Sequence, residues 1–237
     1  MKILGIDSSG QTASVAIVQD DITIAEYTVT YKKTHSQTLL PMLDEIANMT
    51  EQDLSDIDAI AVAAGPGSFT GLRIGSAMAK GLAEAWNKPI VPVETVNGLA
   101  YQMMGTNYLV CPLMDARRNQ TYTGLFDFKA ADGIQEMQCI LPQCAVSLDD
   151  IVAQINKIGR EVIFLGDGVP VFKEQLQKKV TVPFFFAPAF QNRQRAASVA
   201  VLGMQYYKEG KMQTAVEHAP EYLRLSQAER ERNEAGK

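Results

Sequence analysis

The chain has 237 residues, of which 46% are hydrophobic and 21% are charged, and its formal net charge is −5. This composition suffices for a packed core in one large domain or two smaller ones, and it gives no bulk reason to expect direct nucleic-acid binding. The three cysteines have no metal-type spacing and are interpreted as reduced thiols. The first strand reaches an acid at Asp7, and no run approaches the ~18 apolar residues of a membrane helix, so a cytoplasmic protein without membrane contact is expected.

The first part of the chain predicts three antiparallel strands, followed by helices and strands in alternation. The expected strands are 3–7, 12–19, 22–31, 57–64 and 90–93. The expected helices are 36–49, one that ends near Trp86, and one that Thr95 caps and that runs to about residue 104. Segment 57–64 is continuously apolar, which is typical of a parallel strand covered on both faces.

The same order of elements starts again near residue 108. The expected strands here are 108–114, 121–128, 134–140, 162–165 and 180–185, and the expected helices are 147–157, one from the turn at 166–168 to about residue 178, and 194–209. Each half opens with a strand, an aspartate (Asp7 or Asp115), a turn and a second strand. We therefore expect a repeat of about 105 residues that builds two α/β lobes. The lobes are expected at residues 1–106, with the partner-binding helices, and 107–226, and the charged tail 227–237 is expected to be disordered.

The glycine-rich block 65–75 predicts a turn that runs into a helix capped by Ser68 or Thr70. Small residues then recur every four positions on one helix face: Gly71, Gly75, Ala79 and Ala83. Two glycines inside a helix cost roughly 1 kcal/mol each relative to alanine. This face is therefore predicted to accept a close neighbour, either a partner helix or the chain's own sheet, unless a ligand lies at the helix start. The block is not a P-loop, because no Lys-Ser or Lys-Thr follows the glycines.

The two aspartates that end the first strands allow two interpretations. In two-lobed phosphotransferases such acids hold a metal or a water beside phosphates, whereas in the other interpretation Asp7 and Asp115 cap their own turns. The second turn, 116–119, contains no glycine, which disfavours a phosphate loop there. The turn at 166–168 is either a contact for an adenine ring or an ordinary strand-to-helix connection.

The sequence offers no convincing catalytic group. His35 precedes Ser36, the expected cap of the first helix, and His218 lies near the chain end, so the two histidines do not form a zinc motif. Both are interpreted as surface or capping residues. None of the three cysteines has an evident base beside it, so a nucleophile–base pair is not expected. We therefore predict no catalytic residue, no metal site and no bound cofactor.

Five segments, spread in order over most of the chain, resemble those of one bacterial family. They are 3–9 (ILGIDSS), 35–36 with 39–41 (HS and LLP), 65–75 (GPGSFTGLRIG), 114–118 (MDARR) and 220–224 (PEYLR). The chain is similar to the TsaB (YeaZ) family, whose members belong to the machinery that forms threonylcarbamoyladenosine in tRNA. The resemblance implies an α/β, actin-like, ribonuclease H-like fold of the ASKHA type, with two lobes that each hold a mixed sheet flanked by helices.

The resemblance also implies partners. A TsaB-like subunit pairs with TsaD, a paralogue of the same fold that carries the metal site and transfers the threonylcarbamoyl group, and a small ATPase, TsaE, joins them. The implied role is a non-catalytic activating subunit that meets tRNA only through the complex, with a homodimer as a stand-in when the chain is alone. Whether nucleotide at the subunit junction touches Arg73 or Arg117, and whether Arg117 and Arg118 touch tRNA, stays open.

The helices 36–49 and 72–86 are expected to pack on the same helices of the partner. The interface residues predicted in this way are His35, Leu39, Leu43, Gly71, Arg73, Gly75, Met78, Ala79 and Leu82. The alternative function is an actin-like ATP-dependent phosphotransferase or ATPase that uses Asp7 and Asp115. A peptidase, an older label for this family, is disfavoured because a metal-ligand pair and a nucleophile–base pair are both missing from the sequence.

Overall fold

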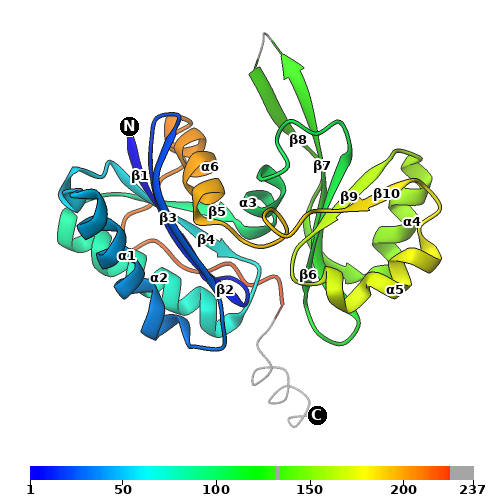
Figure 1. Ribbon diagram of the computed structural model, residues 1–237, viewed down its shortest axis with the longest axis horizontal. Helices are drawn as coiled ribbons and strands as arrows, with labels where there is room; N and C mark the ends of the chain where they lie inside the picture. The colour runs from blue at the N-terminus through cyan, green and yellow to red at the C-terminus, as the bar shows by residue number, and fades with distance from the viewer. Residues whose placement is uncertain (132–133, 225–237) are drawn as a thin grey trace.

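The computed structural model describes residues 1–131 and 134–224, and the chain there builds two five-stranded sheets (Figure 1). In the first sheet, β1 pairs with β2 in the antiparallel direction and with β4 in the parallel direction, and the strand order is β3-β2-β1-β4-β5. Its strands are β1 (Lys2–Asp7), β2 (Thr12–Gln19), β3 (Ile22–Thr30), β4 (Ala59–Gly65) and β5 (Ile90–Glu94). Strand β4 is buried along its whole length, as its continuous apolar sequence predicts.

The second sheet repeats the plan of the first. Its order is β10-β9-β6-β7-β8, with β6 antiparallel to β7 and parallel to β9. Its strands are β6 (Leu109–Asp115), β7 (Gln120–Ala131), β8 (Ile134–Ser147), β9 (Val162–Leu165) and β10 (Phe184–Phe186). The expected repeat and the α/β class with two mixed sheets are therefore confirmed.

Helices cover the faces of both sheets. They are α1 (His35–Thr50), α2 (Phe69–Trp86), α3 (Thr95–Tyr101), α4 (Leu148–Ile158), α5 (Val169–Lys179) and α6 (Ala196–Lys208), with a short 3₁₀ turn at Leu54–Asp56. Figure 1 shows α1 and α2 on one side of the first sheet and α6 on the other. Alternate residues of β1 serve the two cores: Leu4 and Ile6 pack with α1 and α2, whereas Ile3 packs in the cluster that contains α6. In the described part of the chain, no helix is long and apolar enough to cross a membrane.

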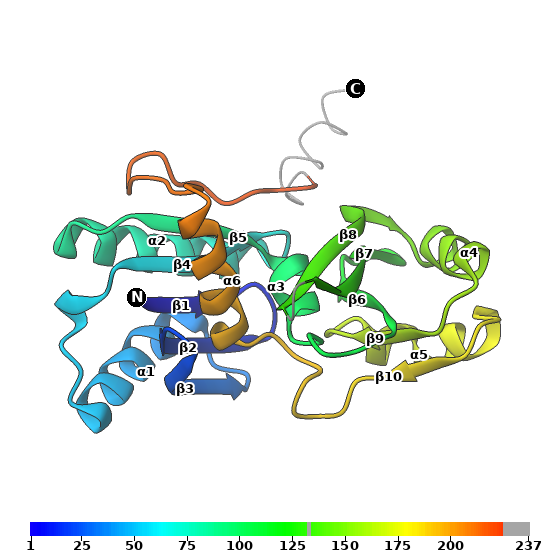
Figure 2. The ribbon, with the colours of Figure 1, turned by 90° about the horizontal axis from the view of Figure 1, so that it is seen from above.

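Helix α6 lies within the range expected for the second lobe, 107–226, yet it packs on the first sheet (Figure 2). Two glycines allow this close contact: a Cβ on Gly5 would meet the Ala196 carbonyl oxygen, and a Cβ on Gly203 would meet Ala61. Residues 196–208 therefore belong to the first lobe. They bury the apolar side chains on the face of the first sheet opposite α1 and α2. The expected tail, 227–237, lies outside the described residues.

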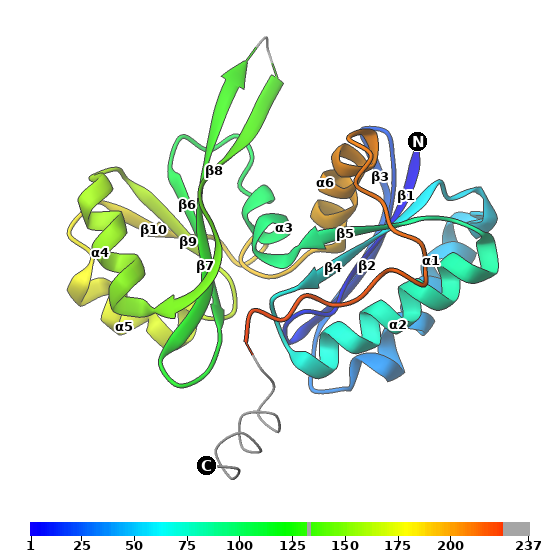
Figure 3. The same cartoon turned by 180° about the vertical axis from the view of Figure 1, so that it is seen from behind.

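The segment after α6 continues along the first lobe. We call residues 211–224 the C-terminal strap. Gln213 exchanges two backbone hydrogen bonds with Ile90, at 2.8 and 2.9 Å, and the Glu221 N–H donates to the Ala64 carbonyl at 2.7 Å. Figure 3 shows this segment beside α2 and β4, ending between the two lobes.

Some predicted boundaries were wrong for local reasons. Thr95 is the first residue of α3, not its cap; the cap is Glu94, and the Thr95 hydroxyl accepts from the Gly65 N–H at 3.2 Å. Strand β10 has three residues, Phe184–Phe186, because Val180 ends α5.

Of the two residues expected to cap α2, Ser68 is the cap, since its hydroxyl accepts from the Gly71 N–H at 3.2 Å.

Candidate functional site

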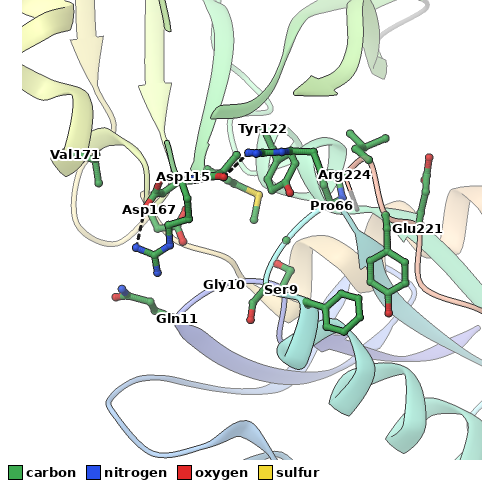
Figure 4. Close-up of a pocket in the computed structure, with 18 residues that line it drawn as sticks. Ser9, Gly10, Gln11, Pro66, Asp115, Tyr122, Asp167, Val171, Glu221 and Arg224 are labelled. Atoms are coloured by element: carbon green, nitrogen blue, oxygen red, sulfur yellow. Dashed lines mark hydrogen bonds and ion pairs between the residues drawn. The ribbon is translucent and has the colours of Figure 1, made fainter. Parts of the chain in front are cut away.

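A cleft of about 480 Å³ lies between the lobes (Figure 4). Its walls come from the β1–β2 turn, the start of α2, the β6–β7 turn, the start of α5 and the end of the strap. Residues from these five segments include Ser9, Gly10, Gln11, Ser68, Phe69, Asp115, Arg117, Tyr122, Asp167, Val171, Glu221, Tyr222 and Arg224. The β1–β2 turn and the β6–β7 turn, which are equivalent in the two repeats, thus line the same cleft.

Both strand-ending aspartates cap their own turns. One oxygen of Asp7 accepts from the Ser9 N–H at 2.9 Å and from the Ser9 hydroxyl at 2.7 Å. One oxygen of Asp115 accepts from the Arg117 N–H at 2.8 Å, and the other lies 3.2 Å from the Arg117 guanidinium. Burial raises the pKa of Asp7 to about 6, although the hydrogen bonds from Ser9 oppose this rise. Both aspartates thus make the contacts that the turn-capping interpretation predicts.

The β6–β7 turn has a backbone that differs from its counterpart in the first lobe. Arg117, Arg118 and Asn119 have φ angles of 64°, 54° and 58°, which is the left-handed region that favours glycine. The Arg117 side chain is 84% exposed. Where the first lobe presents Ser9 and Gly10 to the cleft, the second lobe presents charged side chains on a strained turn.

Asp167 and Gln194 lie behind the β1–β2 turn. A Cβ on Gly10 would lie 2.6 Å from the Gln194 side-chain nitrogen and 3.2 Å from a carboxylate oxygen of Asp167. Burial raises the pKa of Asp167, while Arg193 lowers it less. Gln194 is 1% exposed, and neither of its amide atoms has a hydrogen-bond partner within the described residues. Gln194 was not expected at this site, because nothing in the sequence near it indicates that it lies against Gly10.

The turn at 166–168 has a structural explanation. Gly166 has φ of 107°, and a Cβ there would meet the Leu113 carbonyl oxygen. This accounts for the tight strand-to-helix connection without a ligand; an adenine contact stays untested. Within residues 1–131 and 134–224, no group of three or more His, Cys, Asp or Glu side chains is placed to hold a metal ion.

The small-residue face of α2 packs inside the chain itself. A Cβ on Gly71 would meet the Ser8 carbonyl oxygen, and a Cβ on Gly75 would meet the Ser8 hydroxyl. Ala79 and Ala83 are also buried, in the core beneath α1 and α2. The interpretation of this face as a partner surface was therefore wrong: Gly71, Gly75 and Ala79 contact the chain's own sheet and turn. Leu43 is buried in the same core.

A second hollow, of about 410 Å³, lies on the outer side between α1 and α2. We call it the α1–α2 groove. It is lined by His35, Ser36, Leu39, Leu40, Ile74, Ala77, Met78, Gly81 and Leu82. Four residues of the predicted interface, His35, Leu39, Met78 and Leu82, are among them. Ile74, Ala77 and Gly81 were not expected in this surface, although the spacing of Ala77, Gly81 and Ala85 indicates a second small-residue face of the same helix.

Gly81 differs from the other glycines of α2. Nothing lies within 4 Å of the position that its Cβ would occupy. Leu40, across the groove, is 57% exposed. A glycine in the middle of a helix costs roughly 1 kcal/mol relative to alanine, and packing within the described chain does not explain it here.

His35 connects this groove with the cleft. It is the first residue of α1, whose cap is Thr34, so Ser36 is not the cap that the sequence suggested. The His35 Nε2 lies 2.9 Å from the Gly10 carbonyl oxygen. A residue that lines the groove thereby contacts the turn that lines the cleft.

Arg73 points away from the groove. Its guanidinium lies 3.9 Å from the Phe69 ring centroid, and its Nε donates to the Tyr222 hydroxyl at 3.1 Å. Arg73, which the sequence placed in the partner interface, therefore contacts the C-terminal strap and is not among the residues that line the groove.

His218, expected at the surface or as a cap, is 1% exposed. Its Nε2 lies 3.0 Å from the Ser76 hydroxyl, and its Nδ1 lies 3.1 Å from the Gln213 side-chain oxygen. This Ser–His pair is not evident from the sequence. Ser76 is buried as well, so the pair has no room for a substrate, and we interpret it as a structural link. Burial lowers the pKa of His218 to about 4, and Lys80 adds to the effect.

The two mixed sheets and the cleft between them define the class as actin-like α/β proteins. The solved structure of YeaZ from Pseudomonas aeruginosa is similar, with a TM-score of 0.77 and 24% identity over 94% of this chain and 99% of that chain. The activator of 2-hydroxyisocaproyl-CoA dehydratase from Clostridium difficile, solved with bound ADPNP, has a TM-score of 0.50 and 10% identity over 89% of this chain and 97% of that one. At these identities the likeness shows the fold alone.

Sequence relatives narrow the class to one family. The family model described as "TsaD: tRNA N6-adenosine threonylcarbamoyltransferase" matches residues 23–232. The tRNA threonylcarbamoyladenosine biosynthesis protein TsaB of Bacillus subtilis (strain 168) is 35% identical over 97% of this chain and 96% of its own length. The protein of the same name from Escherichia coli (strain K12) is 30% identical over 94% and 95%. The chain therefore belongs to the TsaB (YeaZ) family, which shares this model with TsaD, and the resemblance drawn from its motifs is confirmed.

Proposed function

We propose that this chain is a non-catalytic, activating subunit of the cytoplasmic complex that forms N6-threonylcarbamoyladenosine in ANN-decoding tRNAs. It pairs with a TsaD-like paralogue as a heterodimer, a TsaE-like ATPase joins the complex, and tRNA is met through the complex. The names of two relatives, both tRNA threonylcarbamoyladenosine biosynthesis proteins, support the assignment of this chain to that pathway. The role within it rests on the structural observations below.

The observation that carries the proposal is the α1–α2 groove with Gly81 at its open side. Its lining is mostly apolar, and Leu40 and Met78 contribute large side chains that are only partly covered. Apolar surface of this kind is stabilised when a partner removes it from water. The open space at Gly81 lets the backbone of a partner helix approach closely, which small residues allow.

The partner surface proposed here differs from the one expected from the sequence. The face with Gly71 and Gly75 is used within the chain, so the docking surface is the face that begins at His35 and continues through Met78 and Leu82. The apolar stripe of α1 and the second small-residue face of α2 would then meet two helices of a related subunit. A homodimer in the absence of the paralogue would use the same surface.

The test is titration calorimetry of the purified chain with a purified TsaD-like paralogue, using Gly81→Leu. Because the Cβ of residue 81 has open space, the variant should keep the melting temperature of the wild type while a leucine fills the groove. We expect binding to weaken at least about 100-fold, as for a bulky side chain in the centre of an interface. The matched control, Gln177→Leu on α5, adds an exposed leucine to the other lobe and should bind as wild type. Unchanged binding by Gly81→Leu would exclude the groove as the docking surface.

The rival function, an actin-like phosphotransferase or ATPase, is tested separately by titrating the chain alone with magnesium-ATP. Asp7 and Asp115 cap their own turns, which supports a cleft without that chemistry. We expect no heat from the chain alone and measurable heat once the paralogue is present. Tight binding by the chain alone would revive the rival.

A further inference from the structure

The two lobes are joined at one end by a shared apolar core. Helix α3 follows the first sheet but contacts β6 and β7 of the second. Its residues Val96 and Leu99 belong to one buried cluster with Ile3 of the first sheet and with Val110 and Phe126 of the second. This shared core attaches the lobes at α3, so a change in the angle between them would turn about that end. The residues that line the interlobe cleft come from elements other than α3.

The C-terminal strap is held to the first lobe along its length. Ser76 and Lys80 of α2 bind His218, through its ring and its backbone carbonyl respectively, at 3.0 and 2.9 Å. Further on, Glu221 bonds to β4, and its carbonyl oxygen occupies the space that a side chain on Gly65 would need. The strap is thus packed into the first lobe, and it is not a loosely attached end.

The strap then crosses the cleft. The Tyr222 ring lies 4.8 Å from the Phe69 ring on the first lobe. Two residues on, the Arg224 guanidinium donates to the Ala116 carbonyl of the second lobe at 2.6 Å. Beside it, the Gln143 amide on β8 donates to the Glu221 carboxylate at 3.2 Å. Within three residues, 222–224, the chain passes from one lobe to the other.

We propose that the strap fixes the opening of the interlobe cleft: it closes the two-lobed molecule on the side opposite α3, so that the lobes cannot swing apart while Tyr222 and Arg224 are bound. The contacts that do this are few and specific. The Tyr222–Phe69 ring pair holds the strap to the first lobe. The hydrogen bonds from Arg224 to the Ala116 carbonyl and from Gln143 to Glu221 hold it to the second. This role of the C-terminal strap does not depend on the proposed partner, since all of the contacts of the strap named here lie within this chain.

The test measures the distance between the lobes in the full chain. Nitroxide labels are placed on the native Cys139 of β8 and on a new cysteine, Glu84→Cys on α2, with Cys144→Ser to leave the buried Cys111 as the only other thiol. Electron–electron resonance should give one narrow distance distribution in this background. With Tyr222→Ala and Arg224→Ala added, we expect a broader distribution that extends to longer distances.

Amide hydrogen exchange gives a second readout without labels. At Ser9, Gly10 and Ser68, which line the cleft, exchange should become about tenfold faster in the double variant, because local opening sets their protection. Amides in the centre of β4 should not change. The matched controls are Lys211→Ala, at the exposed start of the strap, and Arg118→Ala, beside Ala116; both should keep the wild-type distance and exchange rates.

A double variant with the narrow distribution and unchanged exchange would overturn the proposal. If the double variant loses its cooperative melting transition, Arg224→Ala alone takes its place. It removes the hydrogen bond to the Ala116 carbonyl and leaves the contacts of the strap with the first lobe, so it should still broaden the distribution. A wild-type distribution in this variant would also overturn the proposal.

Discussion

The two small-residue faces of α2 look alike in sequence and have opposite surroundings. Gly71, Gly75, Ala79 and Ala83 face the chain's own sheet, whereas Ala77, Gly81 and Ala85 face outward. On the first face, every added methyl group at a glycine would meet Ser8. On the second, a methyl group at Gly81 would meet nothing. The difference shows that a repeat of small residues indicates a close neighbour without saying whether that neighbour belongs to the same chain.

The covered face should be highly sensitive to added volume. Gly75→Ala places a methyl group against the Ser8 hydroxyl, so we expect the free energy of unfolding to fall by about 2–3 kcal/mol, even after the gain in helix propensity. Urea denaturation followed by circular dichroism measures this. An unchanged midpoint would contradict the close contact with Ser8.

A second substitution sharpens this result. Ser8→Ala removes the hydroxyl but leaves the Ser8 Cβ at 3.6 Å from the position of the added methyl group, which is an ordinary contact. Combined with Gly75→Ala, it should restore more than half of the lost stability. By itself, Ser8→Ala should cost about 1 kcal/mol, because its hydroxyl donates to the Gly71 carbonyl. Purely additive losses would contradict a direct contact.

The side of α2 that the strap covers should show a pH dependence. The pKa of His218 is about 4 in the folded chain against an ordinary 6.5, so between these values the unfolded chain binds more protons. His218 therefore stabilises the fold less as pH falls from 6.5 to 4. We expect the wild type to lose roughly 5 °C more of its melting temperature over this range than His218→Gln does. Equal losses would show that His218 is not held neutral.

Asp7 should act in the opposite direction in an overlapping pH range. Its pKa is raised from 3.8 to about 6, so the folded chain binds more protons there and its contribution to stability is lost as pH rises through 6. Asp7→Asn keeps an acceptor for Ser9 and carries no buried charge. At pH 8 we expect it to be more stable than wild type by about 1.5 kcal/mol, and at pH 4 to be equal. A less stable variant at pH 8 would mean that the charge of Asp7 is used in the folded chain.

The smallest effect is expected on the open face. Gly81→Ala improves helix propensity without any steric contact, so the free energy of unfolding should rise by about 1 kcal/mol. Thermal melting beside Gly75→Ala checks the contrast within one helix. A loss of stability at residue 81 would mean that its surroundings in the chain are closed.

Patterns that repeat along the chain predicted most of the fold. Alternating and continuous apolar runs placed the strands, and the return of the strand–aspartate–turn order at Asp115 predicted that the second sheet copies the first. Ser68 or Thr70 was expected to cap α2 from its place at the start of the helix, and the cap is Ser68. Each of these features depends mainly on residues that are close together in the sequence, so the sequence alone was enough to predict it.

The rest depended on contacts between distant segments. Nothing near Ser76 indicates that His218 will reach it, and nothing near residue 196 indicates that the following helix will cover the first sheet. The groove that we propose as the docking surface lies between the two helices that the sequence indicated. It uses another face of α2, because Gly75 packs against Ser8 of the β1–β2 turn. The spacing of residues shows which of them share a face of a helix. It does not show which distant segment packs against that face.

The position of α6 also bears on how the protein is made. One face of the first sheet, with Ile3, Ala61 and Val91, stays incompletely covered until residues 196–208 have been synthesised, because α6 contacts β1, β2, β4 and β5 on this face. Nearly the whole chain must therefore leave the ribosome before the first lobe can complete its core, and contacts between such distant segments form slowly. Until then part of this apolar face is exposed to water, which favours aggregation. A fragment of residues 1–106 produced alone should aggregate, although it contains a full set of five strands.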